Sequence, residues 1–451
     1  MRASATARRI FLGMVIFGIL LTPACGDMPT ALTEPDAETG GLPTHEKLRN
    51  FELLDEATHP SMSKGGLLEI GLLIGYRDST VEGSRVARRY RVARRYEYDT
   101  VFNGLAGTVS LLELPGILGE MVDDPEIAWV EPDLNVGVID ALLNTTLGVL
   151  NLTTNTLFGL LQTKQVTPWA ITAIEAHRTW ARSGNGSGRV DVDVYFFDTG
   201  ANHADLNVTE CIDFTQGDVR KCGLISNLDL DAHGTSVSGA AAARDDSRGI
   251  VGVVPGARVH ALKVLGDDGS APFSRVIAAI EYLTERKMAH PSMPMVANVS
   301  LGADIRTKNQ SSLDRAVSAS IASGITYVVA AGNESIDAST ITPAHVPEAI
   351  TVGAFNKKGR FSSFSNYGSV IDILAPGEDV ESLTSGNAVN FTSGTSIASP
   401  YVTGAAALML ARHPNMSPSA VRNAVVAKAS SGVSGVPRGT TDKRLNVRYL
   451  P

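Results

Sequence analysis

The sequence predicts an α/β fold in which a central parallel β-sheet carries helices on both faces, preceded by a smaller α+β unit. From residue 188 onward, apolar runs of strand length alternate with longer runs of helix length. Such alternation builds a parallel sheet that is covered by helices. Upstream, residues 67–136 hold strand-like runs on either side of a helical run, which predicts the smaller unit.

Size and charge limit the class of protein. A chain of 451 residues is too long for one ordinary core, so two or three domains are expected. A hydrophobic content of 43% with 43 glycines is typical of a globular, turn-rich protein. The net charge of −8 argues against a general nucleic-acid binder.

The N-terminus has the pattern of an export signal. Three arginines within residues 1–9 precede a short apolar run, and this run is too short for a comfortable membrane span. We therefore expect residues 1–24 to be a signal peptide. The stretch "LLTPAC" is similar to a bacterial lipobox that would lipidate Cys25, although Thr22 stands where that motif usually has leucine. Lipid anchoring and ordinary cleavage with an incidental cysteine both stay open, and export from a bacterial cell is expected in either case.

Only three cysteines are present. If Cys25 belongs to the signal, Cys211 and Cys222 remain in the exported body, where an oxidising compartment favours a disulfide between them. Two free thiols are the alternative.

Composition divides the rest of the chain. Residues 25–66 are polar and predict a lead-in or tether. Residues 67–136 form the small α+β unit, and residues 165–451 form the large domain. Between them, residues 137–164 carry almost no charge, and their apolar residues follow neither a helical nor a strand periodicity. They predict a linker that is cut, with surface association as the other interpretation.

An exact tandem repeat, "RVARRYRVARRY", occupies residues 85–96. Basic and aromatic residues together are typical of nucleic-acid contacts. A solvated helix face explains them equally well, and the acidic total charge favours that interpretation.

Four polar residues stand at strand ends or helix starts of the large domain: Asp198, His233, Asn333 and Ser396. Such positions gather at the carboxyl edge of a parallel sheet. Ser396, in "SGTSIASP", has the position of an ordinary helix cap. With an imidazole to take its proton and a carboxylate to orient the imidazole, it becomes a nucleophile. An Asn amide and a helix N-terminus would stabilise the oxyanion.

At these residues the chain resembles the subtilase family of serine proteases, and the proteinase K-like branch in particular. The resemblance rests on "DTG" and "HADL" after residue 197, "HGTSVSG", "NVSLG", "AAGN", "SSFSNYGSVIDILAPG" and "GTSIASP". It covers residues 165–451 and implies a three-layer subtilisin-like domain. It also implies that residues 67–136 are a ferredoxin-like propeptide, which chaperones folding and then inhibits the enzyme.

The resemblance implies an exported serine endopeptidase that works through an acyl-enzyme and is made as an autoprocessed zymogen. Asp198 would orient His233, the general base, Ser396 would attack, and Asn333 would donate to the oxyanion. The first cut would follow "EPDLNV" or fall as late as Lys164. Proteins and peptides would be the substrates, the propeptide an intramolecular inhibitor, and the enzyme a monomer with no organic cofactor and no nucleic-acid partner.

Further positions follow from the same resemblance. The walls of the S1 pocket would be small and uncharged, which predicts an apolar or aromatic P1 residue and broad specificity. The expected wall residues are Ser300, Leu301, Gly302, Ala330, Ala331 and Gly332. The other edge of the substrate cleft would be Gly269, Ser270 and Ala271. A structural calcium site would use Asp372 with the carbonyls of Pro347 and Ala349.

The alternative is a catalytically silent binding protein that keeps the fold. The presence of all four polar residues argues against it. Ala232 departs from the family, which usually has glycine before the catalytic histidine. This departure bears on the shape of the cleft more than on the mechanism.

Overall fold

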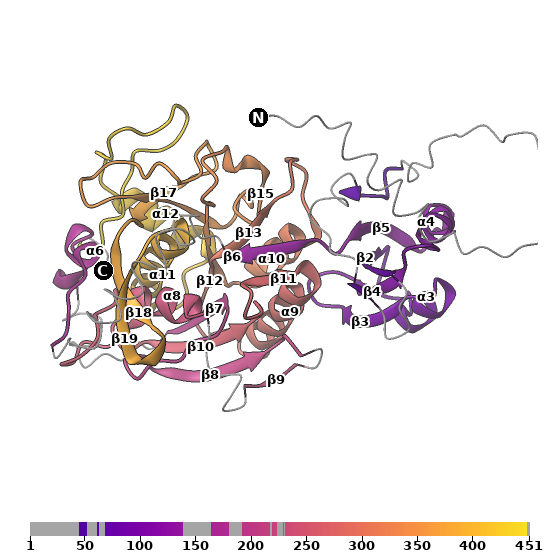
Figure 1. Ribbon diagram of the computed structural model, residues 1–451, viewed down its shortest axis with the longest axis horizontal. Helices are drawn as coiled ribbons and strands as arrows, with labels where there is room; N and C mark the ends of the chain where they lie inside the picture. The colour runs from indigo at the N-terminus through magenta and orange to yellow at the C-terminus, as the bar shows by residue number, and fades with distance from the viewer. Residues whose placement is uncertain are drawn as a thin grey trace, which may run out of the picture. The chain divides into compact units, whose positions relative to one another are not determined.

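The computed structural model describes residues 45–51, 61–62, 68–138, 164–179, 192–216, 219–222, 229 and 231–448 (Figure 1). The expected signal peptide with Cys25 and most of the expected linker lie outside these residues. We call residues 68–138 the N-terminal unit and residues 164–448 the C-terminal domain. Among the described residues, no helix combines the length and the apolar character that a membrane span needs.

The main sheet of the C-terminal domain has eight strands in the order β17-β16-β14-β12-β7-β10-β8-β9. All neighbouring pairs are parallel except β8 with β9. The bounds are β7 (Asp193–Asp198), β8 (Val208–Asp213), β9 (Arg220–Lys221), β10 (Arg258–Lys263), β12 (Met295–Val299), β14 (Thr326–Ala330), β16 (Ile350–Phe355) and β17 (Ile373–Pro376).

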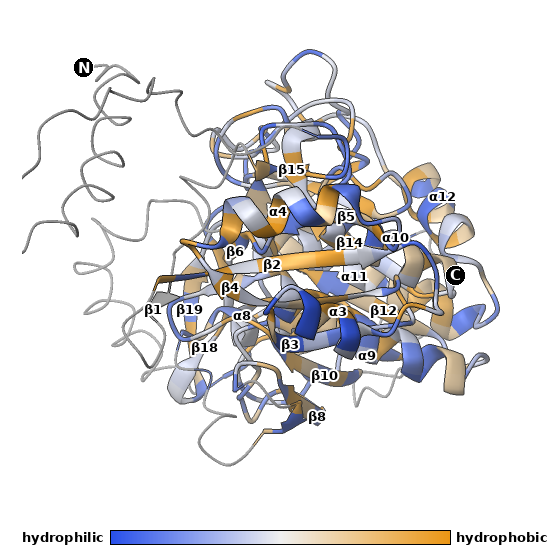
Figure 2. Ribbon diagram, turned by 90° about the vertical axis from the view of Figure 1, so that its right-hand side faces the viewer, coloured by the Kyte–Doolittle hydropathy of each residue, from blue (hydrophilic) through white to orange (hydrophobic). Residues whose placement is uncertain are grey.

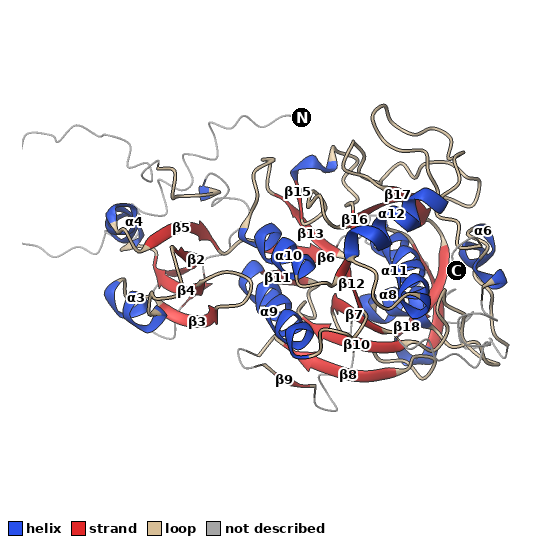
Figure 3. Cartoon of the chain, turned by 180° about the vertical axis from the view of Figure 1, so that it is seen from behind, coloured by secondary structure: helices blue, strands red, loops and turns tan. Residues whose placement is uncertain are grey.

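Helices cover both faces of this sheet, because alternate side chains of each strand point to opposite faces (Figure 3). On β7, Val194 and Phe196 enter one core with α8 (His233–Ala242) and α11 (Thr395–Arg412). Tyr195 and Phe197 enter the other core with α9 (Phe273–Ala289) and α10 (Ser312–Ala322). The remaining elements of the domain are α6 (Trp169–Ala173), η2 (Ala176–Arg178), η3 (Ala338–Thr340), η4 (Ser385–Asn387), α12 (Pro418–Lys428) and the hairpin β18 (Val380–Thr384) with β19 (Ala388–Thr392).

The N-terminal unit is a βαββαβ fold. Its strands pair antiparallel in the order β5-β2-β4-β3, and the short β1 also pairs with β2. The bounds are β1 (Ser61–Met62), β2 (Leu68–Tyr76), α3 (Gly83–Arg89), β3 (Ala93–Tyr98), β4 (Gly104–Ser110), α4 (Leu114–Asp123) and β5 (Ile127–Pro132). Figure 2 shows β2 as largely hydrophobic and α3 as hydrophilic.

The tandem repeat takes two conformations. Its first copy, residues 85–90, lies in α3 and the following cap, whereas most of the second copy, residues 91–96, lies in β3. The expected solvated helix face therefore holds for the first copy only. The cause is tertiary, because the second copy pairs with β4 and sheet pairing overrides local helix propensity.

Part of the expected tether is packed rather than loose. Arg49 donates its backbone N–H to Val130 at 2.9 Å, and Val130 donates to the carbonyl of Lys47 at 2.8 Å. The Lys47 ammonium also bonds to the carbonyls of Val122, near the end of α4, at 2.7 Å and of Asp124, directly after α4, at 2.8 Å. Residues 45–51 thus extend the N-terminal unit upstream of residue 67.

A second sheet joins the two parts of the chain. Its order is β11-β6-β13-β15, with bounds β11 (Ser270–Pro272), β6 (Asn135–Val138), β13 (Leu301–Asp304) and β15 (Ile341–Thr342). The last strand of the N-terminal unit, β6, runs antiparallel to both β11 and β13. It therefore lies between two strands of the C-terminal domain.

Candidate active site

A buried contact between a histidine and a carboxylate lies at the carboxyl end of the main sheet. Asp198 is the last residue of β7, and His233 is the first residue of α8. His233 Nδ1 lies 2.7 Å from Asp198 Oδ1, and both side chains are at most 4% exposed. The same oxygen accepts the Thr199 N–H at 2.7 Å, so the carboxylate is held in one orientation.

The N-terminus of α8 is held by residues that the sequence analysis did not single out. Asp229 accepts backbone N–H bonds from Ala232 at 3.1 Å and Thr235 at 2.7 Å. Thr199 donates its hydroxyl to Asp229 at 2.7 Å and accepts the N–H of Gly234 at 3.0 Å. Ala232 has φ +66°, a left-handed conformation that favours glycine; this explains why its replacement of glycine matters locally.

Ser396 is the second residue of α11 and is fully buried. Its carbonyl accepts the Ser300 hydroxyl at 2.9 Å. Behind it, Asn298 bonds the hydroxyls of Ser300 at 2.8 Å, Ser399 at 3.1 Å and Thr403 at 2.8 Å. This buried polar network ties α11 to β12, so the start of the helix is held from its inner side.

Asn333 is tied to the same helix start. Thr395 donates its N–H to Asn333 Oδ1 at 2.9 Å, and its hydroxyl accepts the Gly332 N–H at 3.0 Å. Gly332 has φ +104°, and a Cβ there would lie 2.1 Å from Asn366 Nδ2. The amide of Asn333 is therefore fixed beside the residue that precedes Ser396. α8 also packs against α11, so all four expected residues come from neighbouring segments of one edge.

The expected substrate strands flank β6. Ala271 pairs with Val136 and Ser270 with Gly137 on one side. Leu301 pairs with Val138 and Gly302 with Gly137 on the other side. The remaining expected wall residues are Ala330 at the end of β14 and Ala331 and Gly332 directly after it.

The expected calcium ligands do not fit a cation. Arg422 on α12 contacts Asp372 with two nitrogens, Nη2 to Oδ1 and Nε to Oδ2, the second at 3.1 Å. Asp372 Oδ2 also accepts the Thr351 N–H at 3.0 Å. A guanidinium thus takes both carboxylate oxygens, and its charge would repel a metal ion. The expectation for Asp372 with Pro347 and Ala349 therefore has no support in the donor set.

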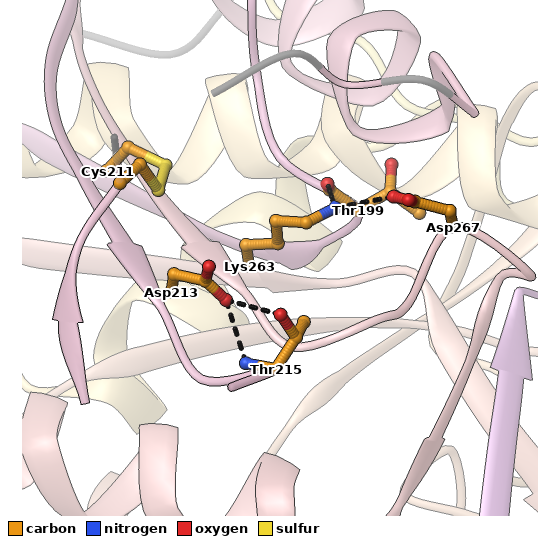
Figure 4. The surroundings of a disulfide bond; sticks show 7 residues. Thr199, Cys211, Asp213, Thr215, Lys263 and Asp267 are labelled. Atoms are coloured by element: carbon orange, nitrogen blue, oxygen red, sulfur yellow. Dashed lines mark hydrogen bonds and ion pairs between the residues drawn. A yellow bond between two sulfur atoms is a disulfide. The ribbon is translucent and has the colours of Figure 1, made fainter. Parts of the chain in front are cut away.

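Cys211 and Cys222 are joined by a disulfide with a Cα–Cα distance of 5.3 Å (Figure 4). On the same side of the main sheet, the buried Lys263 ammonium donates to the Thr199 carbonyl at 2.6 Å and to Asp267 at 3.3 Å. Lys263 therefore supports the turn that follows Asp198.

The chain was compared with protein families and known proteins. The model of the subtilase family matches residues 189–446. This chain is a subtilase. The expected subtilisin-like α/β fold with a mostly parallel sheet and flanking helices is confirmed, and the subtilase is a serine endopeptidase that acts on proteins or peptides.

Two curated relatives, a Thermus proteinase and a Bacillus subtilisin, agree with this assignment. An extracellular serine proteinase of Thermus sp. (strain Rt41A) is 32% identical over 433 residues, which cover 93% of this chain and 94% of that protein. Subtilisin DY of Bacillus licheniformis is 36% identical over 272 residues, or 59% of this chain and 93% of that protein. The crystal structure of a cold adapted subtilisin-like serine proteinase aligns with a TM-score of 0.49 at 32% identity, over 58% of this chain and 89% of that one.

Proposed function

We propose that this subtilase cleaves peptide bonds with a Ser396 nucleophile, a His233 base and an orienting Asp198. The observation that carries the proposal is the 2.7 Å contact between His233 Nδ1 and Asp198 Oδ1. An Nδ1–H that donates to the carboxylate makes Nε2 the basic nitrogen. His233 then takes the Ser396 proton as the hydroxyl attacks, and returns it to the leaving amine.

The developing oxyanion needs donors that are already in place. Asn333 accepts the Thr395 N–H with its Oδ1, so its Nδ2 is the end of the amide that can donate. The backbone N–H of Ser396, in the first turn of α11, is the second donor. Losing one such donor raises the barrier by about 3–4 kcal/mol. Water then hydrolyses the acyl-enzyme with the same base, and the chemistry uses side chains and water alone.

We further propose broad specificity with an apolar or aromatic P1 residue. The strands β11 and β13 bind an extended chain mainly through backbone hydrogen bonds, which are independent of side-chain identity. The walls expected around P1 are small and uncharged, so they select for apolar character rather than charge.

The N-terminal unit is proposed to be an inhibitory propeptide. Support comes from β6, which takes the place of an extended substrate between β11 and β13. The Val138 N–H donates to the Gly269 carbonyl at 2.8 Å. The alignment with the Thermus proteinase over 93% of this chain includes this segment, so the relative shares an N-terminal extension.

Three carboxylates support docking of the unit. Glu131 accepts the Ser312 N–H at 3.1 Å at the start of α10, and Asp133 accepts the Ser274 N–H at 2.8 Å at the start of α9. Both sites put negative charge at a helix N-terminus, which the helix dipole favours. From the C-terminal domain, Glu281 accepts the N–H groups of residues 99–101 at 2.7–3.0 Å.

The strand register supports a first cut shortly after β6. Gly137 pairs with Gly302 and Val138 with Leu301, so the next step along β13 is Ser300. Ser300 bonds to the Ser396 carbonyl, which brings the nucleophile to that step. Ile139, the residue that follows β6, lies outside the described residues; we expect cleavage after it, and an apolar P1 agrees with the proposed specificity.

We propose export from a bacterial cell, either secreted or lipid-anchored through Cys25. The charged and apolar pattern of residues 1–24 supports a signal peptide, and one relative is named an extracellular proteinase. The mature enzyme is proposed to be a monomer.

Labelling with a fluorophosphonate tests the nucleophile. The processed wild type should label and Ser396→Ala should not, while the control Ser393→Ala should label normally because its hydroxyl accepts the Asp379 N–H and has no proposed part in catalysis. Ser396→Ala should also accumulate uncut, and wild type should yield a new N-terminus at residue 140. An unlabelled wild type would favour the silent binding protein. Normal maturation of Ser396→Ala would assign processing to another protease.

A further inference from the structure

A basic cavity of about 510 Å³ lies where β3 of the N-terminal unit meets the start of α9. Three of its lining residues are arginines, two from the N-terminal unit and one from the C-terminal domain. The lining residues are Arg94, Arg95, Tyr96, Thr215, Gln216, Pro272, Ser274 and Arg275. The second copy of the tandem repeat thus supplies one wall, a role that the proposed protease mechanism does not use.

Two of the arginines form no ion pair with any residue that the structure describes. Arg94 pairs with Glu97. Within the described part of the chain, neither Arg95 nor Arg275 forms an ion pair, and Arg275 Nη1 donates to the Val264 carbonyl at 3.1 Å. Asp133 interacts electrostatically with both Arg95 and Arg275 and offsets part of their charge.

Two acidic groups are bonded to residues that line the cavity. Asp133 accepts the N–H and the hydroxyl of Ser274 at 2.8 and 2.5 Å. Asp213 accepts the N–H and the hydroxyl of Thr215 at 2.8 and 2.6 Å; Figure 4 shows this turn. These bonds hold the wall opposite β3 in place, so the arginines face a fixed polar surface.

We propose that this cavity binds a small phosphate-bearing anion. A guanidinium presents paired N–H donors that match the oxygens of a phosphate group, and such charge-assisted bonds are stronger than neutral ones. The cavity is many times larger than one water, which takes up about 30 Å³ of liquid. A diphosphate group offers enough oxygens to bond to more than one of these arginines.

The ligand would join the two parts of the chain. Arg94 and Arg95 belong to the N-terminal unit, whereas Arg275 lies in the first turn of α9 in the C-terminal domain. A ligand that binds only the docked state stabilises that state in proportion to its concentration. The anion would thus retain the N-terminal unit on the enzyme; this consequence rests on the proposed propeptide role, whereas the binding itself does not.

The test uses the full chain with Ser396→Ala, which holds the precursor uncut. Pyrophosphate is titrated in by calorimetry at constant ionic strength, with orthophosphate as a second arm. We expect saturable pyrophosphate binding and weaker orthophosphate binding. Arg95→Ala and Arg275→Ala should each weaken the pyrophosphate affinity by about 10-fold or more, since each removes a charged hydrogen bond.

The tandem repeat offers a matched control. Arg88, the counterpart of Arg94 in the first copy, is exposed on α3, and Arg88→Ala removes the same charge from the same unit. It should leave the affinity within about twofold of the parent. The proposal is overturned if pyrophosphate does not bind saturably, or if Arg88→Ala weakens it as much as Arg95→Ala. Fluorophosphonate labelling tests the protease function separately, so the two failures are distinguishable.

Discussion

Glu131 offers a measure of how tightly the N-terminal unit is docked. It is fully buried at the end of β5 and accepts the Ser312 N–H at 3.1 Å and the Ser312 hydroxyl at 2.8 Å. Arg315 lies 3.3 Å from its other oxygen and stacks over the Trp129 ring with its guanidinium carbon 4.2 Å from the centroid. Replacing Glu131 by alanine removes the acceptor from all three donors.

The expected cost follows from these contacts. Breaking a buried ion pair by removing one partner costs about 3–5 kcal/mol, which corresponds to a change of roughly 100- to 4,000-fold in an equilibrium constant. Glu131→Gln keeps one acceptor oxygen for Ser312. Burial raises the pKa of Glu131 despite the opposing effect of Arg315, so loss of the charge in Glu131→Gln should weaken docking less than loss of the acceptor in Glu131→Ala. We expect Glu131→Gln to weaken the docking of the N-terminal unit by about 1–2 kcal/mol.

Hydrogen exchange of the β6 amides in the uncut Ser396→Ala chain reports the docking equilibrium. Glu131→Ala should accelerate exchange at Val138 by at least about 100-fold, and Glu131→Gln by much less. Glu113→Ala is the control, because its exposed pair with Arg91 contributes only about 0–1 kcal/mol. Exchange in Glu131→Ala within threefold of the parent, or equal effects of the alanine and glutamine variants, would refute the reasoning.

Three more predictions concern the C-terminal domain. Replacing Cys211 and Cys222 by serine should lower the free energy of unfolding by about 3 kcal/mol, because the disulfide closes a short loop; chemical unfolding with and without reductant measures this. Burial raises the pKa of Asp205 to about 7, so the folded state holds a proton that the unfolded chain releases near pH 4, and stability should fall as pH rises from about 4 to 7. Asp205→Asn should flatten that slope in unfolding experiments at several pH values. Calcium should not raise the melting temperature through Asp372 in the parent, but should do so in Arg422→Ala, where the carboxylate is released; an equal calcium effect in both proteins would contradict the ion-pair assignment.

The sequence predicted the main sheet well because its strands carry a strong signal. In β7, Val194 and Phe196 serve one core while Tyr195 and Phe197 serve the other, so the whole run is apolar. Polar residues after such runs fall at the carboxyl edge by topology alone. This is why the sequence alone predicts that Asp198 and Asn333 lie at that edge.

Contacts between distant segments were not accessible in the same way. The letters RVARRY give a helix in one copy and mostly a strand in the next, so local propensity does not decide between them. Asp229 and Arg422 act through partners that only the fold brings near. A single acidic or basic residue has no periodic pattern, and its partner is set by packing.

If β6 left the second sheet, the edges of β11 and β13 that pair with it would lose their hydrogen-bond partner. Unpaired borders recruit any extended chain of adequate length, including a surface loop of a neighbouring enzyme molecule. The cleft that would bind substrates would therefore also bind exposed loops of other molecules of the same enzyme. We expect mature enzyme to be lost by mutual digestion, at a rate that rises with the square of its concentration.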